Sequence, residues 1–306
     1  MKYINTISQD ISVSQVALGC MRISGMTPEQ IEHYISNALD HGYNYFDHAD
    51  IYGGNGLCEE LFGKALALNP ALRDRMVLQT KRAIRPGMYD FSKEHILNAV
   101  DGSLKRLGVE KIDVLLLHRP DILMEPEEVA EAFDVLQASG KVSHFGVSNH
   151  NALQIQLLQK YVRQPLKINQ MQLSVASASM LSSGANVNLM NDDGVNRDGY
   201  LRDYCRLNEI TIQPWSPLQF GFIKGSLFTN EDYAPLHKKI NELAEKYGVT
   251  DSGIAIAWLL RLPDRMQPIV GSVNEQRIND IAKAADIELT RKEWYDLYLA
   301  AGYTLP

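Results

Sequence analysis

The chain has 306 residues, of which 45% are hydrophobic and 22% charged, a composition that predicts a folded globular protein and excludes a disordered one. Thirty Lys and Arg against 37 Asp and Glu give a formal net charge of −7, which disfavours a nucleic-acid backbone as partner. The longest apolar run, 254–260, is far shorter than the ~20 residues of a membrane span, and no secretory signal opens the chain, so we expect a cytoplasmic protein.

Short apolar or β-branched segments alternate along the chain with segments of helical periodicity. The opening residues 2–14 alternate polar and apolar side chains around a polar turn, which predicts a β-hairpin. Eight strands are then predicted at 16–18, 43–46, 76–79, 113–117, 142–147, 167–171, 211–215 and 267–270. The predicted helices cover 28–41, 58–68, 92–107, 126–139, 152–161, 199–207, 236–247 and 252–262.

This βα alternation predicts an α/β protein with a single (β/α)8 TIM barrel domain over residues 1–306, with the N-terminal hairpin closing the bottom of the barrel. From the first predicted strand to the eighth, the chain spans close to the ~250 residues that are typical of this fold. A doubly wound open sheet would place GxGxxG after its first strand, whereas residues 19–22 read GCMR. The polar segment 173–199 is expected to be an unusually long loop.

Neither a disulfide framework nor a metal site is predicted. Cys20, Cys58 and Cys205 form an odd, widely separated set without CxxC spacing, so we expect reduced thiols. The eight histidines show no HExxH or other close pairing.

Candidate catalytic residues stand where the predicted strands end, which is where barrel enzymes carry their chemistry. Strand two ends in Asp47 and is followed by Tyr52, strand three ends in Lys81, and strand four ends in His118. An acid, a phenol, an ammonium and an imidazole on one rim predict a site for proton transfer. A tyrosine near an ammonium can serve as the acid, because the positive charge favours its phenolate.

In these residues the chain resembles the aldo-keto reductase family, most closely a bacterial branch of uncharacterised oxidoreductases. The landmarks occur in the order of that family and cover residues 16 to about 280. They are DHADIYG at 47–53, LQTK at 78–81, LLLHRP at 115–120, GKVSHFGVSN at 140–149, QPWSPL at 213–218 and PIVGSVNEQRI at 268–278.

The resemblance implies an NADPH-dependent oxidoreductase that reduces aldehyde or ketone carbonyls to alcohols by hydride transfer. Tyr52 would donate the proton to the carbonyl oxygen. Lys81 would favour the developing phenolate, Asp47 would hold Lys81 in its charged form, and His118 would orient the carbonyl oxygen.

The resemblance also implies a binding site for NADPH or NADP+ and a substrate pocket. Many relatives carry Lys where Gly271 stands, so we expect a weaker preference for NADPH over NADH than in those relatives. The predicted cofactor residues are Ser148, Asn149, Gln170, Trp215, Ser216, Leu218, Gly271, Ser272 and Arg277. The predicted substrate residues are Met21, His48 and Arg119.

Two alternatives stay open at this point. One is a lyase on the same fold that uses Lys81 as a Schiff-base nucleophile, which requires a neutral amine. The other is a redox-sensing module that binds NADPH with little turnover.

A small-molecule carbonyl substrate is the expected partner, with no nucleic acid and no membrane. A monomer is favoured over an oligomer.

Overall fold

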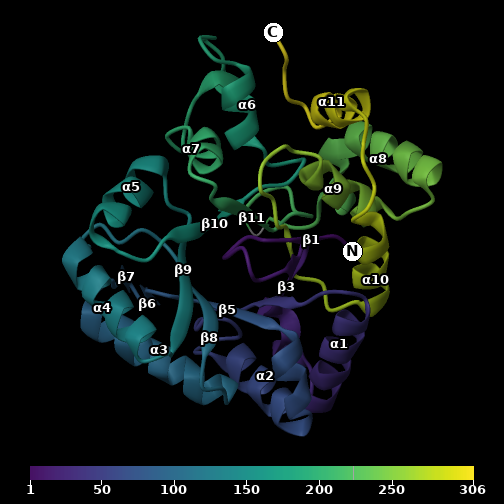
Figure 1. The fold of residues 1–306 in the computed structure, drawn as a ribbon. Helices are drawn as coiled ribbons and strands as arrows, with labels where there is room; N and C mark the ends of the chain where they lie inside the picture. Colours follow the sequence, from purple (N-terminus) through teal and green to yellow (C-terminus); the bar gives the residue numbers. More distant parts are fainter. Residues whose placement is uncertain (223) are drawn as a thin grey trace.

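Eight parallel strands curl into a barrel in the computed structural model, which describes residues 1–222 and 224–306 (Figure 1). The strands lie in the order β11-β10-β9-β8-β5-β4-β3-β12. A parallel bridge between Ile212 and Met266 joins the two ends of the sheet, so the predicted barrel is confirmed. The strands are β3 (Ala17–Gly19), β4 (Tyr45–Asp47), β5 (Val77–Arg82), β8 (Ile112–Leu117), β9 (Val142–Ser148), β10 (Leu166–Gln172), β11 (Thr211–Trp215) and β12 (Ile269–Val270).

Helices surround the barrel, and the eight predicted ones are present with ends within two residues of those expected. Their limits follow local capping. Thr27 accepts a hydrogen bond from the Gln30 amide to start the first, and Gly108 ends the third in a left-handed conformation, with φ 64°. They are α1 (Pro28–Asp40), α2 (Leu57–Leu68), α3 (Lys93–Leu107), α4 (Pro126–Ala138), α5 (Ala152–Tyr161), α7 (Leu201–Leu207), α8 (Ala234–Tyr247) and α9 (Asp251–Leu260).

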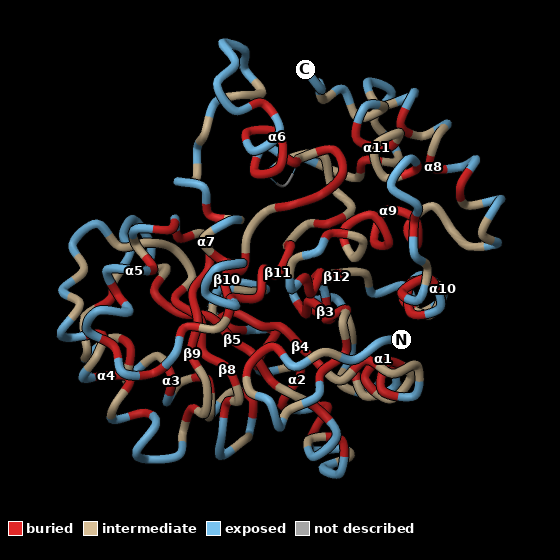
Figure 2. Tube along the Cα trace, turned by 45° about the horizontal axis from the view of Figure 1, so that its top comes forward, coloured by how far each residue is buried: buried red, intermediate tan, exposed pale blue. Residues whose placement is uncertain are grey.

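The N-terminal hairpin is also confirmed and packs against the end of the barrel where the strands begin. Its strands β1 (Tyr3–Ile4) and β2 (Val13–Ser14) pair antiparallel. Ile7 and Val13 belong to the same buried cluster as Tyr45 and Ile168, which lie in the barrel strands. In Figure 2 the barrel strands are coloured as buried and many of the peripheral loops as exposed. The hairpin therefore leaves the opposite end, where the strands finish, open for a site.

The prediction of one long loop over 173–199 is wrong. This segment contains α6 (Ser179–Ala185) and a short 3-10 turn at Asp192–Gly194. The C-terminal residues hold it in place, because the Tyr303 hydroxyl accepts a hydrogen bond from the Ala178 amide at 2.5 Å and the Thr304 amide donates one to Asp193 at 2.9 Å. The polar composition of the segment does not indicate these contacts, because the residues that make them lie more than 100 positions away.

Two C-terminal helices complete the fold, α10 (Glu275–Ala284) and α11 (Arg291–Ala300). Trp258 of α9 stacks on Trp294 of α11 with ring centroids 4.8 Å apart. Each indole N–H donates to the backbone carbonyl of the other residue, at 3.1 Å and 3.0 Å, so the polar atoms of both rings are satisfied. These contacts attach α11 to the barrel.

Within the described ranges, no helix is long and apolar enough to cross a membrane. Over the same ranges, no group of three or more His, Cys, Asp or Glu side chains is placed to hold a metal ion. Cys20, Cys58 and Cys205 are all buried and free of disulfides.

Candidate active site

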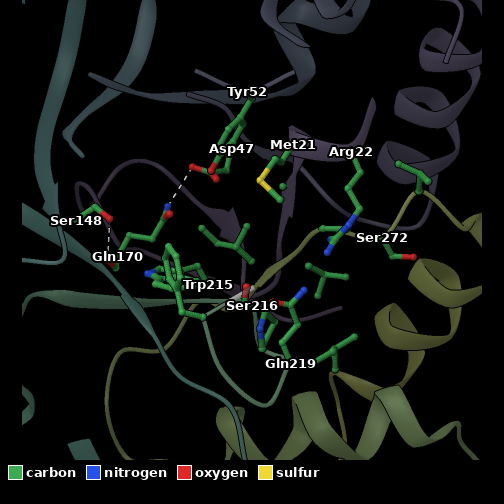
Figure 3. A pocket seen from close by; sticks show the side chains of 18 of the residues that line it. Met21, Arg22, Asp47, Tyr52, Ser148, Gln170, Trp215, Ser216, Gln219 and Ser272 are labelled. Atoms are coloured by element: carbon green, nitrogen blue, oxygen red, sulfur yellow. Dashed lines mark hydrogen bonds between the residues drawn. The ribbon is translucent and has the colours of Figure 1, made fainter. Parts of the chain in front are cut away.

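The ends of the barrel strands surround a cavity of about 950 Å³. This volume lies near the upper end of the ~300–1,000 Å³ that is usual for ligand pockets. Residues at the ends of seven strands, β3, β4, β8, β9, β10, β11 and β12, contribute to its wall. Figure 3 shows Ser148, Gln170 and Trp215 toward one end of the cavity, and Arg22 and Ser272 toward the other.

Asp47 and Lys81 form a buried ion pair at one side of the cavity. They come from the adjacent strands β4 and β5, and their side chains meet inside the barrel. All three protons of the Lys81 ammonium are used, two on the carboxylate of Asp47 and one on the backbone carbonyl of His48 at 2.8 Å. Burial lowers the pKa of Lys81, and Asp47 opposes that effect. The pair therefore keeps a charged amine where solvent cannot reach it.

A chain of glutamine side chains supports Asp47 from inside the barrel. Gln79 and Gln170 each donate to Asp47 Oδ1, at 2.6 Å and 3.1 Å. Both also donate to Gln213, which in turn donates to Gln267 at 2.9 Å. Sequence reasoning found only Gln170 of this set. The available signal was a glutamine within a buried strand, as at Gln79 of β5 and Gln213 of β11.

Tyr52 and His118 both line the cavity next to this ion pair. The Tyr52 ring centroid lies 5.0 Å from Lys81 Nζ and 6.4 Å from the centroid of the His118 ring, with the two rings edge to face. Burial raises the pKa of Tyr52 well above 10.0, while burial and the charges of Lys81 and Arg119 lower the pKa of His118 well below 6.5. At neutral pH the phenol is therefore protonated and the imidazole is neutral.

His48 does not line the cavity, so the prediction that it belongs to the substrate pocket is wrong. Successive side chains along a strand point to opposite faces, and Asp47 takes the inward direction. The His48 ring is completely buried and packs edge to face against Phe62 of α2, with centroids 4.5 Å apart. Burial lowers its pKa to about 4, which makes it a neutral core residue.

Residues predicted for the nicotinamide end meet in the cavity and contact each other. Asn149 has a left-handed backbone, φ 61°, immediately after β9. Its amide nitrogen donates to the His118 carbonyl at 3.1 Å, and its amide oxygen accepts from the Trp215 indole at 3.1 Å. Ser148 donates to the Gln170 carbonyl at 2.9 Å (Figure 3). Asn149 thus ties β8 and β11 together across the site.

The predicted residues at the other end, Ser216, Leu218, Gly271, Ser272 and Arg277, also line the cavity. Ser216 adopts a left-handed backbone with φ 52°, a strained conformation of the kind that clusters at functional sites. Ser272 precedes α10, and Asn274 and Arg277 at the start of this helix also line this end of the cavity.

Arg22 is a site residue that sequence reasoning missed. It lines the cavity beside Ser272 (Figure 3), and its Nη1 donates to the Gly271 carbonyl at 2.8 Å. A Cβ atom at position 271 would stand 2.8 Å from Nη1, so the glycine leaves room for this arginine. The contact joins residues 249 positions apart, and no local pattern indicates it.

The chain is similar to known proteins over nearly its whole length. The model of the Aldo/keto reductase family matches residues 15–298. The uncharacterized oxidoreductase YcsN of Bacillus subtilis is 36% identical, over 98% of each chain. A 6-dehydroglucose reductase of Novosphingobium aromaticivorans is 36% identical, over 97% of this chain and 94% of the relative. The crystal structure of an aldo/keto reductase from Klebsiella pneumoniae, in complex with NADP and acetate, superposes with a TM-score of 0.77 at 25% identity, covering 100% and 97% of the two chains.

Proposed function

This chain belongs to the aldo/keto reductase family, and we propose that it is an NADPH-dependent oxidoreductase that reduces aldehyde or ketone carbonyls to alcohols. The observation that carries the proposal is the position of Tyr52 and His118 on the cavity wall, with the Lys81 ammonium 5.0 Å from the Tyr52 ring. Bound NADPH would supply a hydride to the carbonyl carbon.

Tyr52 is the proton donor in this proposal. Because burial raises its pKa, the phenol holds its proton across the physiological range and can transfer it only to a strongly basic oxygen. A carbonyl oxygen becomes such a base as negative charge develops on it during reduction. Neutral His118 would donate a hydrogen bond to the same oxygen and orient it.

Lys81 and Asp47 act on Tyr52 through charge. The three ammonium protons are already bonded to Asp47 and His48, so Lys81 stabilises the phenolate across space rather than through a direct hydrogen bond. Asp47 keeps the amine protonated and fixed, and Gln79 and Gln170 hold Asp47. This arrangement is preorganised before any substrate binds.

The cavity suits NADP(H) in both charge and shape. Arg22, Ser272 and Arg277 line the cavity near the start of α10, where two cations and the positive end of the helix dipole favour an anion. We assign the adenosine 2′-phosphate to this end. The opposite end offers the Trp215 ring and the side chains of Ser148 and Gln170, which suit a nicotinamide. Arg22 supplies a positive charge beside Gly271, the position at which many relatives carry a lysine.

The Schiff-base lyase fits this geometry poorly. Such a nucleophile must be neutral and reachable, whereas Lys81 is completely buried, bonded to Asp47 and absent from the cavity wall. Treatment with borohydride in the presence of a carbonyl compound would leave a permanent adduct on a lyase and none on the proposed reductase.

Steady-state kinetics test the proposed function against a binding module with little turnover. Purified protein is mixed with NADPH and a panel of aldehydes and ketones, and the loss of NADPH absorbance is followed. A reductase of this family should reach kcat values within the usual ~1–10³ s⁻¹ for at least one member. Tight NADPH binding without oxidation by any carbonyl in the panel would support the binding module instead.

A further inference from the structure

Arg119 places a positive charge in the cavity next to the reacting groups. It directly follows His118 at the end of β8, and its side chain is half-buried in the cavity wall. The guanidinium carbon lies 5.9 Å from the centroid of the Trp215 ring and 5.6 Å from that of Phe222. Contacts of this kind with aromatic faces hold a guanidinium in place and leave its N–H edges for other partners.

Among the residues that the structure describes, this guanidinium has no carboxylate partner. The only carboxylate in the described cavity wall is Asp47, whose charge is already matched by Lys81. Burial lowers the pKa of Arg119, and Tyr89 is the one group that opposes this effect. A partly buried cation without a counter-ion is unfavourable unless a ligand completes it.

Arg119 stands apart from the end of the cavity assigned to the cofactor phosphate. In the sheet order, β8 lies four strands from β12, which places the ends of the two strands on opposite sides of the eight-stranded barrel. Arg22 and Arg277 accompany Gly271 and Ser272 after β12. Arg119 instead accompanies His118, where the carbonyl group would bind.

We propose that the preferred substrates of this enzyme are aldehydes or ketones that also carry a carboxylate, and that Arg119 binds this carboxylate. The planar guanidinium matches a carboxylate with two parallel hydrogen bonds. The inference rests on the proposed reductase function, because it concerns the substrate of that same site. It makes Arg119 a residue that determines specificity, with no part in proton transfer.

The test compares each carboxylate substrate with its own methyl ester, which keeps the reacting carbonyl and removes the charge. Suitable pairs are para-carboxybenzaldehyde and succinic semialdehyde, each against its ester. The quantity measured is the ratio of kcat/KM for acid over ester. The wild type should favour the acid by about tenfold or more, as for a charge-assisted hydrogen bond. The preference should appear mainly in KM.

Substitutions then assign the ratio to Arg119. R119M should reduce it to about one, and R119E to below one because the new charge repels the acid. R119K should keep part of it, because a lysine retains the charge without the planar fork. R291M is the matched control, since Arg291 is an exposed arginine at the start of α11, away from the cavity, and should keep the wild-type ratio.

A binding experiment separates failure of this inference from failure of the proposed function. Benzoate and benzamide are titrated against wild type and R119M, following the protein fluorescence, to which Trp215 beside Arg119 contributes. Selective loss of benzoate affinity in R119M supports the carboxylate site, even if no carbonyl is reduced. A wild type without preference for acid over ester, or equal affinity of wild type and R119M for benzoate, would overturn it.

Discussion

Lys81 Nζ lies 2.6 Å and 2.7 Å from the two carboxylate oxygens of Asp47, and both side chains are almost completely removed from solvent. A buried charge pair of this kind stabilises a fold only weakly compared with apolar packing. Lys81 Nζ lies 5.0 Å from the centroid of the Tyr52 ring. This position points to a role for the pair in the electrostatic environment of that phenol.

Lys81→Met should lower kcat by about 10²-fold or more, as expected when a group that assists proton transfer is removed. NADPH affinity should change little, because Lys81 is not part of the cavity wall. Both quantities are measured on the same preparation, by turnover and by fluorescence titration. Lys64→Met, at an exposed position on α2, serves as the control. A variant with wild-type kcat would remove Lys81 from the mechanism.

The pH dependence of kcat should show no inflection near pH 6.5, the ordinary pKa of a histidine. Burial holds the pKa of His118 well below 6.5, so the ring stays neutral as the pH falls through that value. Burial raises the pKa of Tyr52 above 10.0, so the phenol stays protonated as the pH rises toward it. We expect kcat to be flat through pH 6.5. An inflection there that disappears in His118→Gln would show that His118 titrates normally and contradict the account.

Glu59 of α2 holds together the elements that flank Tyr52. It is completely buried and bonds to Arg82 and Thr80 of β5 and to Ser103 of α3. Burial alone would raise its pKa, but Arg82, Ser103 and Thr80 outweigh that effect and lower the pKa to about 2. The stabilisation is therefore complete above the ordinary value of 4.5 and is lost as the pH falls toward 2.

Glu59→Gln should destabilise the protein by about 3–5 kcal/mol at neutral pH, because it removes the carboxylate nearest to the buried Arg82 guanidinium and leaves it Asp50 at 3.8 Å. Urea unfolding midpoints measure the loss. Glu60→Gln is the neighbouring control, since Glu60 pairs with Lys64 on the exposed face. Equal midpoints for both variants would mean that the buried network contributes no more than a surface pair.

Cofactor selectivity tests the phosphate end. Arg277→Ala and Arg22→Met should each weaken NADPH binding by about tenfold or more, the effect of one charge-assisted hydrogen bond. NADH carries no 2′-phosphate, so its affinity should fall far less. Fluorescence titration with each cofactor gives the contrast, with Trp258 and Trp294 remote from the cavity wall. Equal losses for both cofactors would show that these arginines do not bind the 2′-phosphate.

The sequence predicted the barrel because each strand and helix carries its own local signal. Thr27, Ser92 and Gly108 mark helix ends whatever the rest of the chain does. Asp47, Tyr52 and His118 could be placed on one rim because parallel strands of a barrel all finish at the same end. The same reasoning brought Lys81 to Asp47 once β4 and β5 were neighbours.

Other parts of the site depend on directions and distant contacts that a linear pattern does not contain. His48 was misplaced because neighbouring strand residues face opposite ways, and only the observed position of Asp47 decides which one faces the cavity. Arg22 reaches Gly271 across the barrel. The segment around α6 is ordered by Tyr303 and Thr304, which lie at the far end of the chain.

The most direct test of the account is the turnover of Tyr52→Phe, which removes one oxygen atom from the cavity. With NADPH and the best carbonyl substrate, kcat should fall by about 10²–10⁴-fold, the usual contribution of a general acid. The NADPH dissociation constant, measured on the same sample, should stay within about twofold, because the change removes an interaction made only in the transition state. A Tyr52→Phe variant that reduces the carbonyl at the wild-type rate would contradict the assignment of Tyr52 as the proton donor.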